Sequence, residues 1–375
     1  MKIFKPLLYS LLVCFTFCSA QNPDANTPTF IKRSTFLSDN QKTDGMDLFV
    51  DSILKKYMQN SERCGISIGI SKNGKDYFYN YGETKRGSEN IPKQTSIYEI
   101  GALTTIFCGQ LLEQAIRDNK IKAEDDIRNY LPGKFLNLEF NKKPILVKHL
   151  VQHTSGLPLV PADLKEETDF DALNPYAHYT KKMLLNYLKT FELTRSSGSM
   201  NDYSNTGIAL LGIVLEGVYD KTFSELVNEN ICIPLGLKNT WIDLNTEQTQ
   251  NLSSGYNIDG EATPAWTFDV FAAAGGLKSC TEDVLNYLKF NLEEIKNSVK
   301  NSGAKTKVGK ENLGMAWYVS KTKNGTILYS QSGGTFGYGA FSGFIAKEDC
   351  AVILLSNNGI NLEFLGIAIL NYLQQ

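Results

Sequence analysis

An excess of charge of either sign is absent from this sequence. Its 375 residues include 38 Lys and Arg against 40 Asp and Glu, which leaves a formal net charge of −2. This near-neutral balance gives no reason to expect nucleic acid as a partner. The chain has no internal repeat and no low-complexity tract, and its 42% of hydrophobic residues are sufficient for a buried core.

Histidine is scarce, with three residues in the whole chain. No cluster of His, Cys, Asp and Glu has the spacing of metal ligands, so no metal is expected. No Gly-rich loop follows a strand in the way that a phosphate cradle does, and no cofactor is predicted. We interpret His149, His153 and His178 as structural residues, with His153 holding a turn.

Apolar runs long enough to span a bilayer are absent as well. The short apolar run at residues 7–17 follows Lys2 and Lys5 and precedes small residues at 18–20. This order is typical of a signal peptide, which we place at residues 1–20. The sequence therefore predicts export, either to the periplasm or as a secreted protein, and membrane anchoring is not expected.

A dense set of cysteines is also lacking. Cleavage after residue 20 leaves five cysteines, which are far apart and odd in number: Cys64, Cys108, Cys232, Cys280 and Cys350. Their spacing matches neither a disulfide framework nor a zinc site. We expect them to be buried as small hydrophobic residues.

Strand patterns at both ends of the chain enclose a mostly helical middle. A helical pattern at 46–58 precedes an alternating strand at 66–70, an Asn73-Gly74 turn and a return strand at 76–81. The later elements are predicted as helices at 146–152, 183–188, 206–219 and 223–230, strands at 326–331, 339–346 and 351–356, and a final helix at 362–373.

These elements predict a mixed α/β fold, more specifically α+β. One antiparallel sheet is flanked by helices and joined to a mostly helical subdomain. The expected parts are a flexible lead-in at 21–45, one domain at 46–375, a sheet formed by 62–82 and 313–356, and a helical part at about 120–265. We also expect a turn at Gly333 and Gly334, and a solvated loop in the Lys-rich residues 296–310.

A core helix is predicted where residues 99–107 begin a wide apolar stripe. Leu103, Phe107 and Leu111 recur at four-residue spacing, which suits a helix that packs into a core. The preceding residues 94–99 have an extended pattern. This segment resembles the nucleophile helix of the serine β-lactamase and penicillin-binding DD-peptidase family, where the same frame carries Ser-x-x-Lys.

Further segments resemble the same family in the same order, and they are most similar to its class C β-lactamase and D-aminopeptidase/esterase branch. Tyr203-Ser204-Asn205 matches the second motif of the family. Gln331-Ser332-Gly333-Gly334 stands where the family carries Lys-Thr-Gly or His-x-Gly. Residues 153–158, 234–237 and 274–279 are also similar, and the resemblance covers about residues 62–373. It implies a β-lactamase/transpeptidase-like fold.

The resemblance assigns a role to each matched position. In such a site the Ser attacks the acyl carbon, a neighbouring base takes its proton, and the Tyr can shuttle protons. Two backbone N–H groups, here those of Ala102 and Gly334, stabilise the oxyanion. The implied catalytic positions are Ala102, Thr105 and Tyr203, and the implied substrate-binding positions are Asn205, Gln331, Gly333 and Gly334.

Three of these positions, Ala102, Thr105 and Gln331, depart from the family pattern, and Gln331 keeps hydrogen-bonding ability but no charge. Ala102 has no hydroxyl, so no acyl-enzyme can form there, and Thr105 cannot act as an amine base. In a comparable site, loss of the nucleophile costs on the order of 10⁶ in rate. We therefore predict a catalytically impaired, β-lactamase-related protein that acts as a binder of a β-lactam, a D-alanyl peptide or a similar acyl compound.

Two other hypotheses remain open. In one, the protein is an active amidase or esterase with an altered catalytic arrangement, for example a water activated near Tyr203. In the other, it has a structural or protein-interaction role. Ser-x-x-Lys also occurs at three places that do not open a core helix: Ser52/Lys55, Ser302/Lys305 and Ser320/Lys323.

Overall fold

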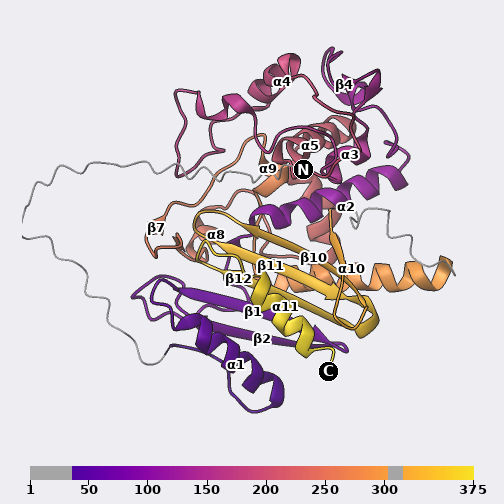
Figure 1. Ribbon diagram of the computed structural model, residues 1–375. Helices are drawn as coiled ribbons and strands as arrows, with labels where there is room; N and C mark the ends of the chain where they lie inside the picture. Colours follow the sequence, from indigo (N-terminus) through magenta and orange to yellow (C-terminus); the bar gives the residue numbers. More distant parts are fainter. Residues whose placement is uncertain (1–35, 303–315) are drawn as a thin grey trace, which may run out of the picture. The chain divides into compact units, whose positions relative to one another are not determined.

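The computed structural model describes residues 36–302 and 316–375, so the predicted signal peptide at 1–20 lies outside the described residues. The described chain contains an antiparallel six-stranded sheet in the order β2-β1-β12-β11-β10-β9 (Figure 1). Its strands are β1 (Gly65–Lys72), β2 (Lys75–Gly82), β9 (Tyr318–Lys321), β10 (Ile327–Gly334), β11 (Gly339–Ile345) and β12 (Cys350–Ser356). The α-helices are α1 (Gly45–Met58), α2 (Thr104–Arg117), α3 (Val147–Val151), α4 (Lys181–Thr190), α5 (Asn205–Tyr219), α6 (Phe223–Val227), α7 (Ile233–Leu235), α8 (Thr246–Gln250), α9 (Ala272–Gly275), α10 (Thr281–Ser302) and α11 (Glu363–Tyr372).

Short elements connect these larger ones. The two-stranded pairs are β3 (Tyr98–Glu99) with β8 (Lys278–Ser279), β4 (Glu139–Phe140) with β5 (Lys143–Pro144), and β6 (Gly255–Tyr256) with β7 (Ala262–Thr263). The 3₁₀ helices are η1 (Gly101–Leu103), η2 (Ile127–Tyr130), η3 (Ala162–Lys165) and η5 (Ala346–Glu348), and η4 (Asn228–Cys232) is a π-helical turn.

The first hairpin forms because the two residues of its turn tolerate positive φ angles. Asn73 and Gly74 have φ values of 51° and 78°, as a two-residue type I′ turn requires. β1 pairs with β2 on one side and with β12 on the other. Strands from the two ends of the chain therefore lie side by side in one sheet (Figure 1).

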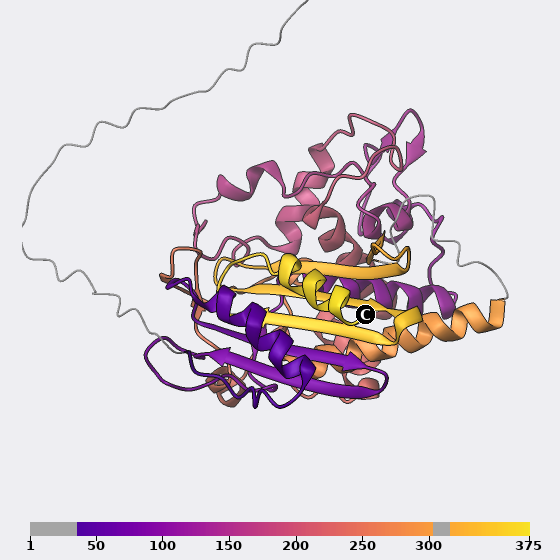
Figure 2. The same cartoon turned by 60° about the horizontal axis from the view of Figure 1, so that its bottom comes forward.

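Different helices cover the two faces of the sheet (Figure 2). α1 and α11 pack on one face, and α10 packs on the other. Alternation along β1 explains this division: Ile66, Ile68 and Ile70 join the core beneath α1 and α11, whereas Gly69 faces Leu285 of α10. The sheet is thus a middle layer with an apolar core on each side.

The helical part lies beside the α10 face of the sheet and is built around two helices. α2 and α5 pack against each other, and both contact α6 and α9. α5 is buried from Thr206 to Leu215, as expected of a core helix. α2 follows directly from η1, and its buried Leu111 and Leu112 belong to the same core. None of the helices within residues 36–302 and 316–375 is long and apolar enough to cross a membrane.

The predicted fold class is confirmed, but two local expectations are wrong. Residues 296–302 are not a loop, because α10 extends to Ser302, and Lys296 on this helix pairs with Glu293 and Asp349 at 2.7 and 2.6 Å. The rest of that expected loop, residues 303–310, lies outside the described part of the chain. Gly333 and Gly334 are not a turn but the end of β10, because they continue the β11 ladder as far as Gly334↔Gly339.

The cysteines and the chain before α1 can also be compared with the sequence predictions. The five cysteines are buried and form no disulfide with one another, as expected. Within the predicted lead-in, residues 36–44 are attached to the sheet: Ser38 forms a bridge with Tyr81, and Asn40 Nδ2 donates a hydrogen bond to Tyr81 Oη at 2.6 Å.

Candidate active-site cleft

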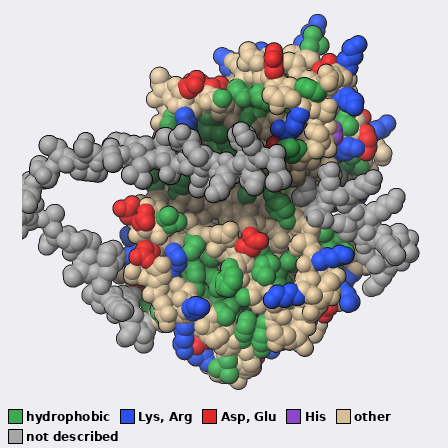
Figure 3. All heavy atoms as spheres, in the orientation of Figure 1, with side chains coloured by type: hydrophobic (Ala, Val, Ile, Leu, Met, Phe, Trp, Pro, Cys, Tyr) green, Lys and Arg blue, Asp and Glu red, His purple; other side chains and the backbone are tan. Residues whose placement is uncertain are grey.

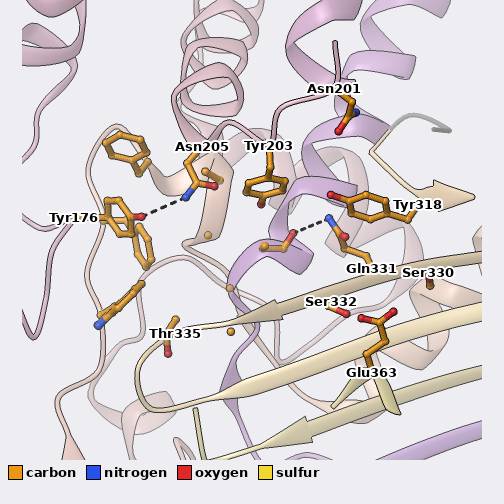
Figure 4. A pocket seen from close by; sticks show the side chains of 18 of the residues that line it. Tyr176, Asn201, Tyr203, Asn205, Tyr318, Ser330, Gln331, Ser332, Thr335 and Glu363 are labelled. Carbon is orange, nitrogen blue, oxygen red and sulfur yellow. Dashed lines mark hydrogen bonds between the residues drawn. The ribbon is translucent and has the colours of Figure 1, made fainter. Parts of the chain in front are cut away.

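A cleft of about 930 Å³ lies between the β10 end of the sheet and the helical part (Figure 4). Segments far apart in the sequence form its walls, including η1, the chain before α5, the chain before α9, β9 and β10. Five of the seven predicted site residues line it: Ala102, Tyr203, Asn205, Gln331 and Gly334. Thr105 and Gly333 do not line it: Thr105 is buried behind Ala102, and Gly333 lines a smaller neighbouring pocket.

Close contact between two backbones positions Ala102. Gly101 has a φ of 51°, and a Cβ atom there would lie 2.5 Å from Gly334 N. A Cβ atom on Gly333 would lie 3.0 Å from Ala102 N and would overlap Ile100 O. Glycine is therefore required on both sides of the contact. It brings Ala102 and Gly334, the proposed oxyanion-hole residues, to one wall of the cleft.

Thr105 and Gln331 form a neutral hydrogen-bonded pair behind Ala102. Thr105 is fully buried, and its Oγ1 donates to Ala102 O at 2.8 Å. The same Oγ1 accepts a hydrogen bond from Gln331 Nε2 at 2.8 Å, and this nitrogen also lies 3.4 Å from Ala102 O. Neither side chain titrates in the physiological range. The positions that carry cationic residues in the resembled family thus contain no proton acceptor of the amine or imidazole kind.

Tyr203 immediately precedes Ser204, the N-cap residue of α5, and its side chain points into the cleft (Figure 4). The cap residue, Ser204, accepts a hydrogen bond from Gly207 N at 2.8 Å, which sets where the helix begins. The Tyr203 hydroxyl is buried and has no hydrogen-bond partner among the described residues. Burial raises the pKa of Tyr203, so its phenol is neutral at physiological pH and can donate a hydrogen bond to a ligand.

His153 supports Tyr203 from behind, outside the cleft lining. The two rings lie 4.2 Å apart between centroids, and His153 Nδ1 accepts a hydrogen bond from Ser204 N at 3.1 Å. Burial lowers the pKa of His153 to about 4, so the imidazole is neutral. His149 Nδ1 likewise accepts from Leu146 N, and His178 Nε2 bonds with Leu164 O. Each histidine therefore has a structural backbone contact.

Tyr176, Trp266 and Phe268 form an aromatic wall at one end of the cleft, which the sequence did not predict. Tyr176 stacks on Phe268 at a centroid distance of 5.6 Å and meets the edge of Trp266 at 5.5 Å. Asn205 Nδ2 donates a hydrogen bond to Tyr176 Oη at 3.3 Å, which links the second motif to this wall. These aromatic residues come from two irregular segments, so no periodicity marked them. The dense aromatic content of residues 266–271 was the available signal.

The opposite end of the cleft was missed for a similar reason. Tyr318 on β9 and Glu363 at the start of α11 lie there, and Ser332 of β10 lies close to Glu363 (Figure 4). Figure 3 shows hydrophobic side chains along the hollow between the helical part and the sheet. Among the described residues, no group of His, Cys, Asp and Glu could hold a metal ion.

Comparison with known proteins places this geometry in a class. A crystal structure of a class C β-lactamase superposes with a TM-score of 0.73 at 20% identity, covering 87% of this chain and 98% of that chain. The fold is therefore that of the class C β-lactamases. The sequence model of the Beta-lactamase family matches residues 50–371, and the chain belongs to this family. The resemblance predicted from the motifs is confirmed.

Two relatives illustrate the range of the family. A β-lactamase of Providencia stuartii is 31% identical over 248 residues, which cover 66% of this chain and 60% of that protein. The D-alanyl-D-alanine-carboxypeptidase/endopeptidase AmpH of Escherichia coli (strain K12) is 24% identical over 366 residues, with 92% of this chain and 90% of that protein covered.

The buried hydrogen bond between Thr105 and Gln331 should contribute to stability. Thr105→Val should lower the free energy of unfolding by about 1–3 kcal/mol, because it leaves the buried Gln331 amide without its best acceptor. Thr105→Val combined with Gln331→Leu should cost less than the sum of the two single changes, because both polar partners are then gone. Urea unfolding of the four proteins measures this coupling. Strictly additive losses would show that the hydrogen bond does not connect the two residues.

His153 generates a pH prediction. Its folded-state pKa of about 4 lies below the unfolded value of about 6.5, so the unfolded chain binds more protons between these values. The free energy of unfolding should therefore fall as the pH falls from about 6.5 to 4. His153→Asn retains an acceptor and suits the positive φ at this position. It should reduce the fall by on the order of 3 kcal/mol.

The control for this experiment is His178→Asn, which removes a partly exposed histidine that also contacts the backbone. Unfolding is measured from pH 4 to 7 for the parent and both variants, and the slopes are compared rather than the absolute stabilities, because His153→Asn also removes the ring contact with Tyr203. An unchanged slope in His153→Asn would contradict the assignment of a buried neutral imidazole.

Proposed function

We propose that this protein is an exported member of the Beta-lactamase family that binds an acyl compound in the cleft and does not turn it over efficiently. The observation that carries the proposal is the neutral centre of the cleft. Ala102 supplies no hydroxyl, and the buried Thr105–Gln331 hydrogen bond occupies the place of the base. A serine hydrolase needs a nucleophile and a base that act as a unit.

The other described residues that line the cleft include serines but no Lys or His that could activate them. Ser320, Ser330 and Ser332 line it, but a hydroxyl is a weak nucleophile without an adjacent base. Lys323, the partner of Ser320 in the sequence pattern, is exposed in the turn after β9 and does not line the cleft. Tyr203 has a raised pKa and a neutral hydroxyl, which makes it a poor base for activating water.

The groups that would hold an acyl compound do not depend on the missing hydroxyl and amine. Ala102 and Gly334 bring their backbone to the cleft, and Tyr203 and Asn205 point into it (Figure 4). The names of the relatives, β-lactamase and D-alanyl-D-alanine carboxypeptidase, indicate the kind of ligand we propose: a β-lactam, a D-alanyl peptide or a similar acyl compound. Residues 1–20 support the proposal of export.

Mass spectrometry and turnover assays test the proposal. The purified protein should hydrolyse neither a chromogenic cephalosporin nor a short-chain ester at a rate above that of the heat-unfolded protein. Incubation with a penicillin or a fluorophosphonate should yield no covalent adduct, because no activated hydroxyl is present. A stoichiometric adduct on any cleft residue would overturn the proposal and would identify a nucleophile.

Restoring the lost pair provides a second prediction. Ala102→Ser alone should have little effect on esterase activity, because the new hydroxyl lacks a neighbouring base. Ala102→Ser with Thr105→Lys should raise the rate and the adduct yield by more than the two single changes together, because nucleophile and base act as a unit. Thr105→Lys alone is the matched control. A folded double variant that is as inert as the parent would show that the cleft no longer accepts an acyl-transfer substrate.

A further inference from the structure

Charge is distributed unevenly in the cleft. Glu363 is the only charged side chain among the described residues that line it, and the described lining contains no Lys, Arg or His. Glu363 is exposed at the start of α11 and forms no ion pair with a described residue. Tyr318 and Glu363 line the same end of the cleft, where burial and, to a smaller extent, the Glu363 carboxylate raise the pKa of Tyr318.

The Gln331 amide lines the cleft, but its donor nitrogen is already hydrogen-bonded within the protein. Gln331 is 2% exposed, and its Nε2 is used by Thr105 Oγ1 and Ala102 O. A ligand carboxylate placed here would lose hydration and would meet hydroxyl groups but no cation in the described lining. Near Glu363 it would meet a charge of the same sign. The centre and the Glu363 end therefore disfavour an anionic ligand.

The opposite end favours an apolar or aromatic group. Tyr176, Trp266 and Phe268 form one contiguous aromatic surface, and Tyr203 lies between this surface and Glu363 (Figure 4). Aromatic faces attract both apolar groups and cations, because the face of the ring carries partial negative charge. The unpartnered Tyr203 hydroxyl can donate a hydrogen bond to an uncharged carbonyl between the two ends.

We propose that the cleft selects acyl compounds that carry an aromatic group and a cationic amine and that lack a carboxylate. This inference rests on the proposed function and specifies its ligand. The aromatic group lies against Tyr176, Trp266 and Phe268, the acyl carbonyl lies near Tyr203, and the amine lies toward Glu363 and Tyr318. Cationic amides are thus favoured over the anionic β-lactams and D-alanyl peptides.

Three benzamides of similar length test the charge preference. N-(3-aminopropyl)benzamide is cationic at pH 7, N-butylbenzamide is neutral, and N-benzoyl-β-alanine is anionic. Isothermal titration at low ionic strength measures their affinities for the protein. We expect the cationic probe to bind about fivefold more tightly than the neutral probe, and the anionic probe to bind more weakly than both. The preference should shrink as salt is added, because the carboxylate is exposed.

Variants at the two ends of the cleft, with one control, test which residue causes the charge preference. Glu363→Gln should abolish the advantage of the cationic probe and leave the affinity of the neutral probe unchanged. Glu247→Gln is the matched control, because Glu247 is also an exposed carboxylate in the first turn of a helix but does not line the cleft. Phe268→Leu should weaken all three probes several-fold and preserve their order, because it alters the end that they share.

The outcomes separate the two proposals. Binding of the neutral probe tests whether the cleft is a binding site, and the order of the three affinities tests the ligand class. Equal affinities, tightest binding of the anionic probe, or a cationic preference that persists in Glu363→Gln would each overturn the ligand class and leave the binder proposal standing. If none of the probes binds at millimolar concentration, the ligand class is overturned, and binding of a penicillin in the same titration decides whether the binder proposal stands.

Discussion

Backbone contact between η1 and β10 is the constraint on which the cleft depends. Gly101 and Gly334 approach so closely that a Cβ atom on Gly101 would lie 2.5 Å from Gly334 N. The contact joins β10 to the beginning of α2 and therefore to the core of the helical part. Because it is made by backbone atoms, its geometry does not require a reactive side chain at position 102.

The replacement of charge by neutral hydrogen bonds has a clear physical consequence. A buried amine costs desolvation energy unless nearby groups compensate for it, and such strain is common where side chains are tuned for catalysis. Thr105 and Gln331 satisfy each other without charge, so the buried position carries little of that cost. The side chains behind Ala102 thus avoid the desolvation cost of a buried charge.

The described lining differs from an anion-binding pocket at both ends. Aromatic rings from two irregular segments form one end, and the Glu363 carboxylate lies at the other. His153 holds the centre in register, because it contacts the Tyr203 ring and the backbone of Ser204 at the same time. The orientation of Tyr203 thus depends on a buried neutral imidazole, and the character of the site depends on uncharged groups with one exposed carboxylate.

The sequence by itself determined the fold class, the family and the positions of Ala102, Tyr203, Asn205 and Gln331, because these follow from local periodicity and from the order of short motifs. Only the tertiary structure decided that Thr105 bonds with Gln331, 226 residues away, and that Gly333 and Gly334 continue a strand. It also decided the aromatic wall and the place of Glu363. These residues lie on irregular segments and a helix end with no shared pattern, and packing of the sheet against the helical part alone brings them to one cleft.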